Sequence, residues 1–136
     1  MKKVIWSRDL AVGIAQIDEQ HQQWIQRLND VAAAIAAKQG PVEIGRTLEF
    51  LSDYTKQHFA TEEQLMAAAH FPGLQAQRAQ HEELTATLQE LVRDFQEEGA
   101  TPKLAEAVDT YLGNWLLRHI RERDLEFGEF SKTRPA

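Results

Sequence analysis

Polar side chains interrupt the apolar faces of four segments that have helical periodicity. The set contains four of the five histidines, a glutamate and a glutamine: His21, His58, Glu62, Gln77, His81 and His119. A buried carboxylate is costly unless it is paired, protonated or bound to a metal. One such histidine is usually an ordinary core residue, but four of them beside a glutamate indicate a metal site.

The donor types favour a pair of transition-metal ions. Imidazole with a few carboxylates suits iron, zinc, copper or nickel better than magnesium or calcium. Four histidines with Glu62 and Asp124 exceed what one tetrahedral ion needs, whereas two ions bridged by the carboxylates would use all six. No glutamate lies three residues before a histidine, as a ferritin-like site requires. The chain has no cysteine, which excludes thiolate metal sites and disulfides.

Three breaks define the elements that must position these donors: Gly40-Pro41, Phe71-Pro72-Gly73 and Gly99 to Pro102. The segments between them predict helices at about 17–39, 41–70, 74–98 and 102–127, each with an apolar stripe at three- and four-residue spacing. Four amphipathic helices with short turns predict an all-α, antiparallel up-down four-helix bundle. We expect one domain over 1–136, with residues 1–16 as an N-terminal arm.

The donors are predicted to lie at one level of this bundle. His21 lies 19 residues before Gly40, and His58 lies 17 residues after Pro41. At about 1.5 Å per residue, the heights of two such residues on antiparallel helices differ by only about 3 Å. The last two helices give a similar match for His81 and His119. All four helices therefore direct a polar residue at the same layer.

Asp124 is the donor that regular helix geometry does not place. It follows His119 by five residues, which is about 140° around an ideal α-helix. Asp124 reaches the layer only if the helix shifts phase or winds differently near its end. Otherwise it is a solvated surface residue beside Arg121 and Arg123.

The composition limits the partners. A net charge of −6 and an isoelectric point near 5.3 argue against nucleic acid or an anionic membrane as a partner. No apolar window is long enough for a membrane span, and the N-terminus lacks a signal-peptide pattern. A cytoplasmic location is therefore the expectation.

Four pieces of the sequence resemble the hemerythrin family in its single-domain bacterial form, the bacteriohemerythrins: "VGIAQIDEQHQQWIQRLN", "YTKQHFATEEQLM", "FPGLQAQRAQH" and "WLLRHIRERD". The resemblance implies a non-haem di-iron centre that binds O2 reversibly. It assigns His21 and His58 to one iron, which keeps a position open for O2, and His81 and His119 to the other. It also implies that Glu62 and Asp124 bridge the irons together with an oxo or hydroxo group.

Gln77 is the departure from the family pattern. The family has His-x-x-x-His after this turn, and here the pair is Gln77 and His81. Gln77 is a candidate for a weak metal ligand, for a ligand that acts through a water, or for a hydrogen-bonding residue. His70, two helical turns before Gln77 and beyond the Pro72-Gly73 break, is too distant to replace the missing histidine and is expected at a helix end.

The leading functional hypothesis is reversible O2 binding for carriage, storage or sensing. Trp115 and Leu116 are candidate walls of an O2 pocket, whereas Trp24 is expected to be ordinary core. NO and peroxide are alternative ligands. The alternative function is a di-iron oxidase or peroxidase, opened by the missing histidine. An interaction module that acts through a separate, unknown protein partner is a third hypothesis.

Overall fold

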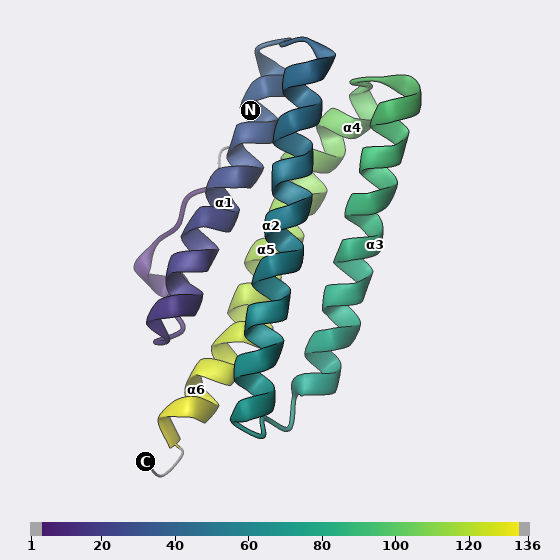
Figure 1. Ribbon diagram of the computed structural model, residues 1–136. Coiled ribbons are helices and arrows are strands. Elements are labelled where there is room, and N and C mark those ends of the chain that lie inside the picture. Colours follow the sequence, from purple (N-terminus) through teal and green to yellow (C-terminus); the bar gives the residue numbers. More distant parts are fainter. Residues whose placement is uncertain (1–3, 134–136) are drawn as a thin grey trace.

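Four antiparallel helical runs make up the computed structural model, which describes residues 4–133 (Figure 1). The elements are α1 (Ala15–Ala36), α2 (Pro41–Ala68), α3 (Leu74–Glu98) and a fourth run of α4 (Pro102–Glu106), η2 (Ala107–Leu112), α5 (Gly113–His119), η3 (Ile120–Asp124) and α6 (Leu125–Thr133). No strand occurs between residues 4 and 133. The prediction of an all-α up-down four-helix bundle is confirmed.

The first two helices end earlier than the residues 39 and 70 expected from the sequence. Lys38 and His70 follow these helices with positive φ angles of 55° and 54°. The N–H of the next residue then donates back to a carbonyl in the last turn, from Gln39 to Ala34 at 3.1 Å and from Phe71 to Met66 at 3.0 Å. These bonds form Schellman motifs, whose left-handed position usually holds glycine. The sequence prediction missed them because lysine and histidine occupy that position.

The fourth run is longer and less regular than the helix predicted at 102–127. It continues to Thr133 and contains two π-helical segments, η2 and η3. In η3 the N–H of Leu125 donates to the carbonyl of Ile120, five residues back. A π turn adds a residue to one turn of an α-helix and so changes which residues share a face.

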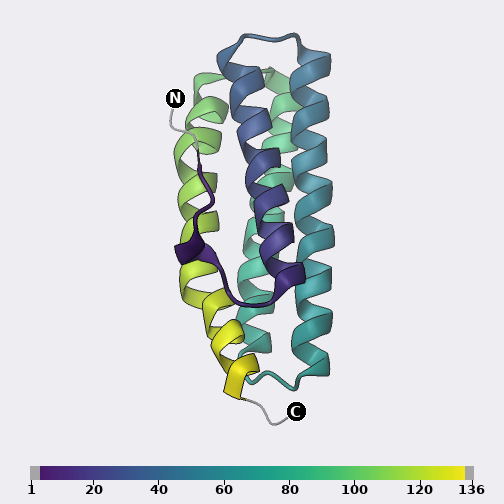
Figure 2. The same ribbon diagram turned by 90° about the vertical axis from the view of Figure 1, so that its left-hand side faces the viewer.

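The N-terminal arm is packed against the bundle from residue 4 onward, and Figure 2 shows it crossing between the fourth run and the start of α1. Residues 1–3 of the predicted arm lie outside the described residues. The backbone of Val4 is held at both its N–H and its carbonyl by the amide of Asn29, at 3.1 and 2.8 Å. Further along, the N–H of Val12 donates to Asp18 at 2.7 Å. The Val12 carbonyl lies so close to Gly128 that a β carbon there would be 2.0 Å away.

The helices are amphipathic, and their apolar faces meet in a core that contains Leu28, Leu51, Leu88 and Leu112. Within the described residues, no helix is long and apolar enough to cross a membrane.

Candidate metal centre

All the predicted donors are buried in the bundle, each with at most 2% of its surface exposed: His21, His58, Glu62, Gln77, His81, His119 and Asp124. His21 comes from α1, His58 and Glu62 from α2, Gln77 and His81 from α3, and the last two from the fourth run. His70 lies apart, exposed at the end of α2. The structure therefore brings the candidate ligands together and excludes the fifth histidine from the cluster.

The donors form two adjoining groups that share one carboxylate. One group consists of His21, His58, Glu62 and Asp124, and the other consists of Glu62, His81 and His119. Within each group the ligand atoms lie within 4.8 Å of one another. Each group is thus compact enough to surround one metal ion.

Both carboxylates face both groups. Asp124 places Oδ2 2.9 Å from His21 Nε2 and Oδ1 3.3 Å from His119 Nε2. Glu62 places Oε2 3.5 Å from His21 Nε2 and Oε1 3.2 Å from His81 Nε2. A carboxylate with one oxygen on each side is the arrangement that bridges two ions.

The π turn of η3 explains how Asp124 reaches the layer. Residues five apart are bonded neighbours in a π turn, as residues four apart are in an α-helix. Asp124 therefore lies on the inward face with His119, although an α-helix would turn it about 140° away. The surface alternative for Asp124 is wrong, because its side chain is fully buried.

Unpartnered atoms show that the residues fit a metal pair. Several buried donor atoms have no hydrogen-bond partner among the described residues: Nδ1 of His21, Nε2 of His58, both oxygens of Glu62 and Oε1 of Gln77. Buried polar atoms are rarely left unpaired. Nε2 of His81 and Nε2 of His119 lie 3.3 Å apart, and two nitrogens bound at right angles to one ion, each at about 2.1 Å, lie roughly 3.0 Å apart.

Outer hydrogen bonds orient three of the histidine rings. Nδ1 of His58 donates to Gln20 at 2.8 Å, and Nδ1 of His119 donates to Gln80 at 2.7 Å. Nδ1 of His81 donates to the carboxylate of Glu63 at 2.9 Å. A proton on Nδ1 leaves the lone pair of Nε2 free to face the centre.

Sequence reasoning missed these outer partners, although a signal was present. Each is the immediate chain neighbour of a donor: Gln20 precedes His21, Gln80 precedes His81, and Glu63 follows Glu62. A neighbour lies about 100° around the helix, at the edge of the inward face. From there its side chain reaches a histidine on an adjacent helix.

Burial and neighbouring charges shift the pKa values of several groups in the cluster. Burial lowers the pKa of His21, but the carboxylates of Asp124 and Glu62 outweigh burial and raise that pKa to about 9. Burial lowers the pKa of His58 to about 4. Burial also raises the pKa of Asp124, but His119 and His21 outweigh it and hold that pKa well below its usual range. With this raised pKa, His21 is protonated at neutral pH, and a metal ion that binds its ring must displace that proton.

Leu116 and Trp115, the two candidate wall residues of an O2 pocket, line two different cavities. Leu116 lines a small internal cavity together with Trp24, Leu51 and Leu88. The cavity has a volume of about 10 Å³, close to the space that one water-sized molecule needs. Trp24, expected to be only core, is thus also part of this apolar wall. Its Nε1 donates to Thr55 Oγ1 at 2.8 Å.

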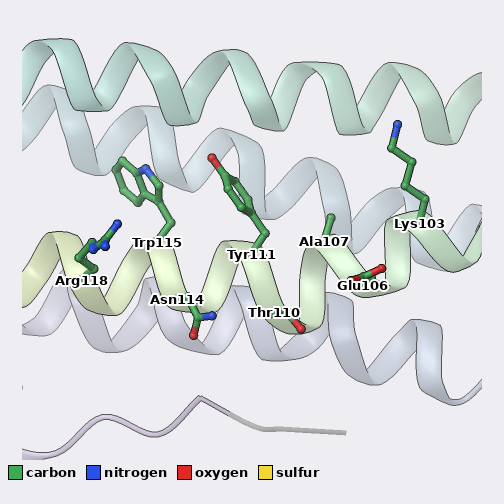
Figure 3. Close-up of a pocket in the computed structure, with 8 residues that line it drawn as sticks. All are labelled: Lys103, Glu106, Ala107, Thr110, Tyr111, Asn114, Trp115 and Arg118. Atoms are coloured by element: carbon green, nitrogen blue, oxygen red, sulfur yellow. The ribbon is translucent and has the colours of Figure 1, made fainter.

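Trp115 instead lines a surface groove of about 700 Å³ on the fourth run. Figure 3 shows Trp115 and Tyr111 pointing to the same side of this run. The indole of Trp115 stacks on the ring of His119, with centroids 4.7 Å apart and planes 16° apart. Trp115 therefore separates the groove from the buried donors, and the groove itself does not contain them.

The fold and the site together define a four-helix bundle that carries a buried metal-binding layer. The family model of the hemerythrin HHE cation-binding domain matches residues 12–130. The chain belongs to the hemerythrin family.

Known relatives and solved structures agree with this assignment. The bacteriohemerythrin of Stenotrophomonas maltophilia is 33% identical over 133 residues, which cover 98% of this chain and 84% of that protein. The myohemerythrin of Sipunculus nudus is 26% identical over 125 residues, or 90% of this chain and 89% of that protein. The crystal structure of a wild-type hemerythrin superposes with a TM-score of 0.81 at 25% identity and covers 92% of this chain and 95% of that one.

Proposed function

We propose that this protein is a non-haem di-iron protein that binds O2 reversibly. Membership of the hemerythrin family supports this function. The observation that carries it is the position of the two carboxylates, Glu62 and Asp124. Each directs one oxygen to each histidine group. Every named relative is a hemerythrin, which favours binding over the oxidase or peroxidase alternative.

The proposed ligand assignment follows the two groups. His21 and His58 hold one iron, and His81 and His119 hold the second. Glu62 and Asp124 bridge the pair, and an oxo or hydroxo group completes the bridge. The first group keeps an open position for the diatomic ligand.

Gln77 serves the second iron in two ways. Its Nε2 donates to Asp124 Oδ1 at 3.0 Å and so holds the bridging carboxylate. Its Oε1 is buried with no hydrogen-bond partner in the described part of the chain. This oxygen is the weak ligand to the second iron, directly or through a water. An amide oxygen is a poorer donor than imidazole for such a metal.

The protein chain contributes shape and protection from water. When bound, the iron pair supplies the electrons that hold O2. Leu116, Trp24 and Leu51 surround the small cavity with apolar surface, which disfavours water. The outer hydrogen bonds keep each ring in its binding orientation. Cytoplasmic residence, and NO or peroxide as alternative ligands, are also part of the proposal.

Iron loading under anaerobic reducing conditions tests the function. We expect two irons per chain, and a visible spectrum that appears with O2 and reverses under vacuum. His58→Ala should lose iron, whereas His70→Ala, which removes the exposed histidine outside the cluster, should retain it. A wild-type chain that binds no iron would overturn the proposal, as would an O2 spectrum that never reverses.

A further inference from the structure

The outer partners of the buried histidines differ in charge. His58 and His119 donate from Nδ1 to neutral amide oxygens, those of Gln20 and Gln80. His81 donates from Nδ1 to a carboxylate, that of Glu63. The strongest acceptor is therefore placed on one particular histidine.

That histidine lies on the side of the cluster where a nitrogen donor is missing. Gln77 and His81 are four residues apart on α3 and so share a face. The amide of Gln77 bonds to Asp124 Oδ1, the same oxygen that lies 3.3 Å from Nε2 of His119. Gln77 thus lies beside the group of Glu62, His81 and His119, which contains only two imidazoles.

Contacts around Glu63 hold its carboxylate in place. Arg78 Nε donates to Oε1 at 3.2 Å, which leaves Oε2 to accept the proton of His81 at 2.9 Å. Arg78 and Glu63 are partly exposed, at 43% and 27% of their side chains. The result is a chain of contacts from the surface through Glu63 to His81.

The orientation of the His81 ring does not depend on Glu63 alone. Phe59 stacks on this ring with centroids 3.8 Å apart and planes only 3° apart. Since Phe59 already holds the ring plane, the carboxylate acts mainly on the position of the ring proton and on the electron density at Nε2. A carboxylate on a ligating histidine raises its basicity as a ligand.

We propose that Glu63 is a positioning residue that strengthens His81 as a donor and offsets the imidazole that Gln77 does not supply. This inference rests on the proposed di-iron function. It assigns to Glu63 a role toward the second iron alone, because its contact is with His81. The first group has no comparable carboxylate on its rings: His58 donates to an amide, and Nδ1 of His21 has no partner among the described residues.

The test measures the affinity of each iron separately. Glu63→Gln keeps an acceptor for His81 and removes the charge, together with the acceptor of Arg78. We expect it to weaken the second Fe(II) by roughly 10-fold and to leave the first unchanged, and Glu63→Ala to weaken it by up to about 100-fold. Anaerobic titration against a competing chelator gives both constants, and Mössbauer spectra count the two iron environments. Glu82→Gln is the matched control, because it removes the same charge from an exposed neighbour of His81 on the same helix.

A compensating variant tells an effect of the carboxylate charge apart from a structural defect. Gln80→Glu gives His119, on the same iron, a carboxylate partner of its own. In the Glu63→Gln background this change should recover most of the lost affinity, which a merely structural defect would not allow. Equal weakening of both irons, no change in either, or no recovery would overturn the inference. A wild-type chain without iron would instead overturn the proposed function itself.

Discussion

Deletion of Glu122 is expected to leave the metal layer intact, although a deletion within a helix normally misaligns all that follows. Glu122 lies in η3, between His119 and Asp124. Its removal makes these two residues four apart, so that a regular α-helical turn places them on one face without a π turn. The deletion therefore removes the extra residue that the π turn accommodates.

The size of the effect follows from helix geometry. In a regular α-helix, deletion of one residue rotates everything that follows by about 100° about the helix axis. A carboxylate about 5 Å from that axis would then move by roughly 7–8 Å. That movement would break the contact of 2.9 Å between Asp124 and His21. After deletion Asp124 stays within about 40° of His119, and the run shortens by about 1.5 Å. Glu122 is exposed and lies 3.9 Å from exposed Arg118, so losing this pair should cost less than about 1 kcal/mol.

Iron content and thermal unfolding provide the assay. The matched control is deletion of Ala60, an exposed residue in the regular helix α2 that lies between the candidate ligands His58 and Glu62. We expect the Glu122 deletion to retain two irons and to unfold within a few degrees of the wild-type temperature, whereas the control should lose iron. If the Glu122 deletion loses iron as completely as the control, the π turn is not what places Asp124.

Three further predictions concern single substitutions. Gln77→His should slow iron release to a chelator by on the order of ten-fold, since it adds an imidazole; unchanged release would show that position 77 does not act on the metal. Lys38→Gly should stabilise the fold by about 0.5–1 kcal/mol, because the backbone there has a φ of 55°, which glycine adopts without strain. The melting temperature should rise by about 3 °C, whereas the control Ala37→Gly, at a φ of −78°, should lower the melting temperature. Gly128→Ala should lower the free energy of unfolding by at least about 1–3 kcal/mol, because it forces a β carbon onto the Val12 carbonyl. Hydrogen exchange at the Val12 amide should become faster, and unchanged exchange would mean that the arm shifts without penalty.

The level of the metal layer was predictable because the rise of a helix does not depend on its sequence. Counting residues from the turns was therefore enough to place His21 beside His58, and His81 beside His119. The position of Asp124 was not predictable in the same way. A π turn depends on how the whole fourth run packs, and no residue type in "HIRERD" specifies it.

The sequence analysis also missed the hydrogen bonds that residues at the edge of the inward face make to histidines on neighbouring helices. Periodicity identifies residues that face the core, but Glu63 and Gln80 act from the flank of a helix on a neighbouring helix. Their role depends on which helix lies beside which, and that information comes only from the assembled bundle. The helix ends at Lys38 and His70 were missed for another reason, because a non-glycine residue there adopts the left-handed backbone.

The two proposed bridging carboxylates come from distant parts of the chain. Glu62 belongs to α2 and Asp124 to η3, so the two bridges are separated by most of the last two helical runs. An intermediate in which only α1 and α2 have paired holds two histidines and one bridge, and lacks every donor of the fourth run. A metal pair held by the proposed ligands would therefore link all four helical runs at one level. Iron retention consequently reports whether the last helical run has docked.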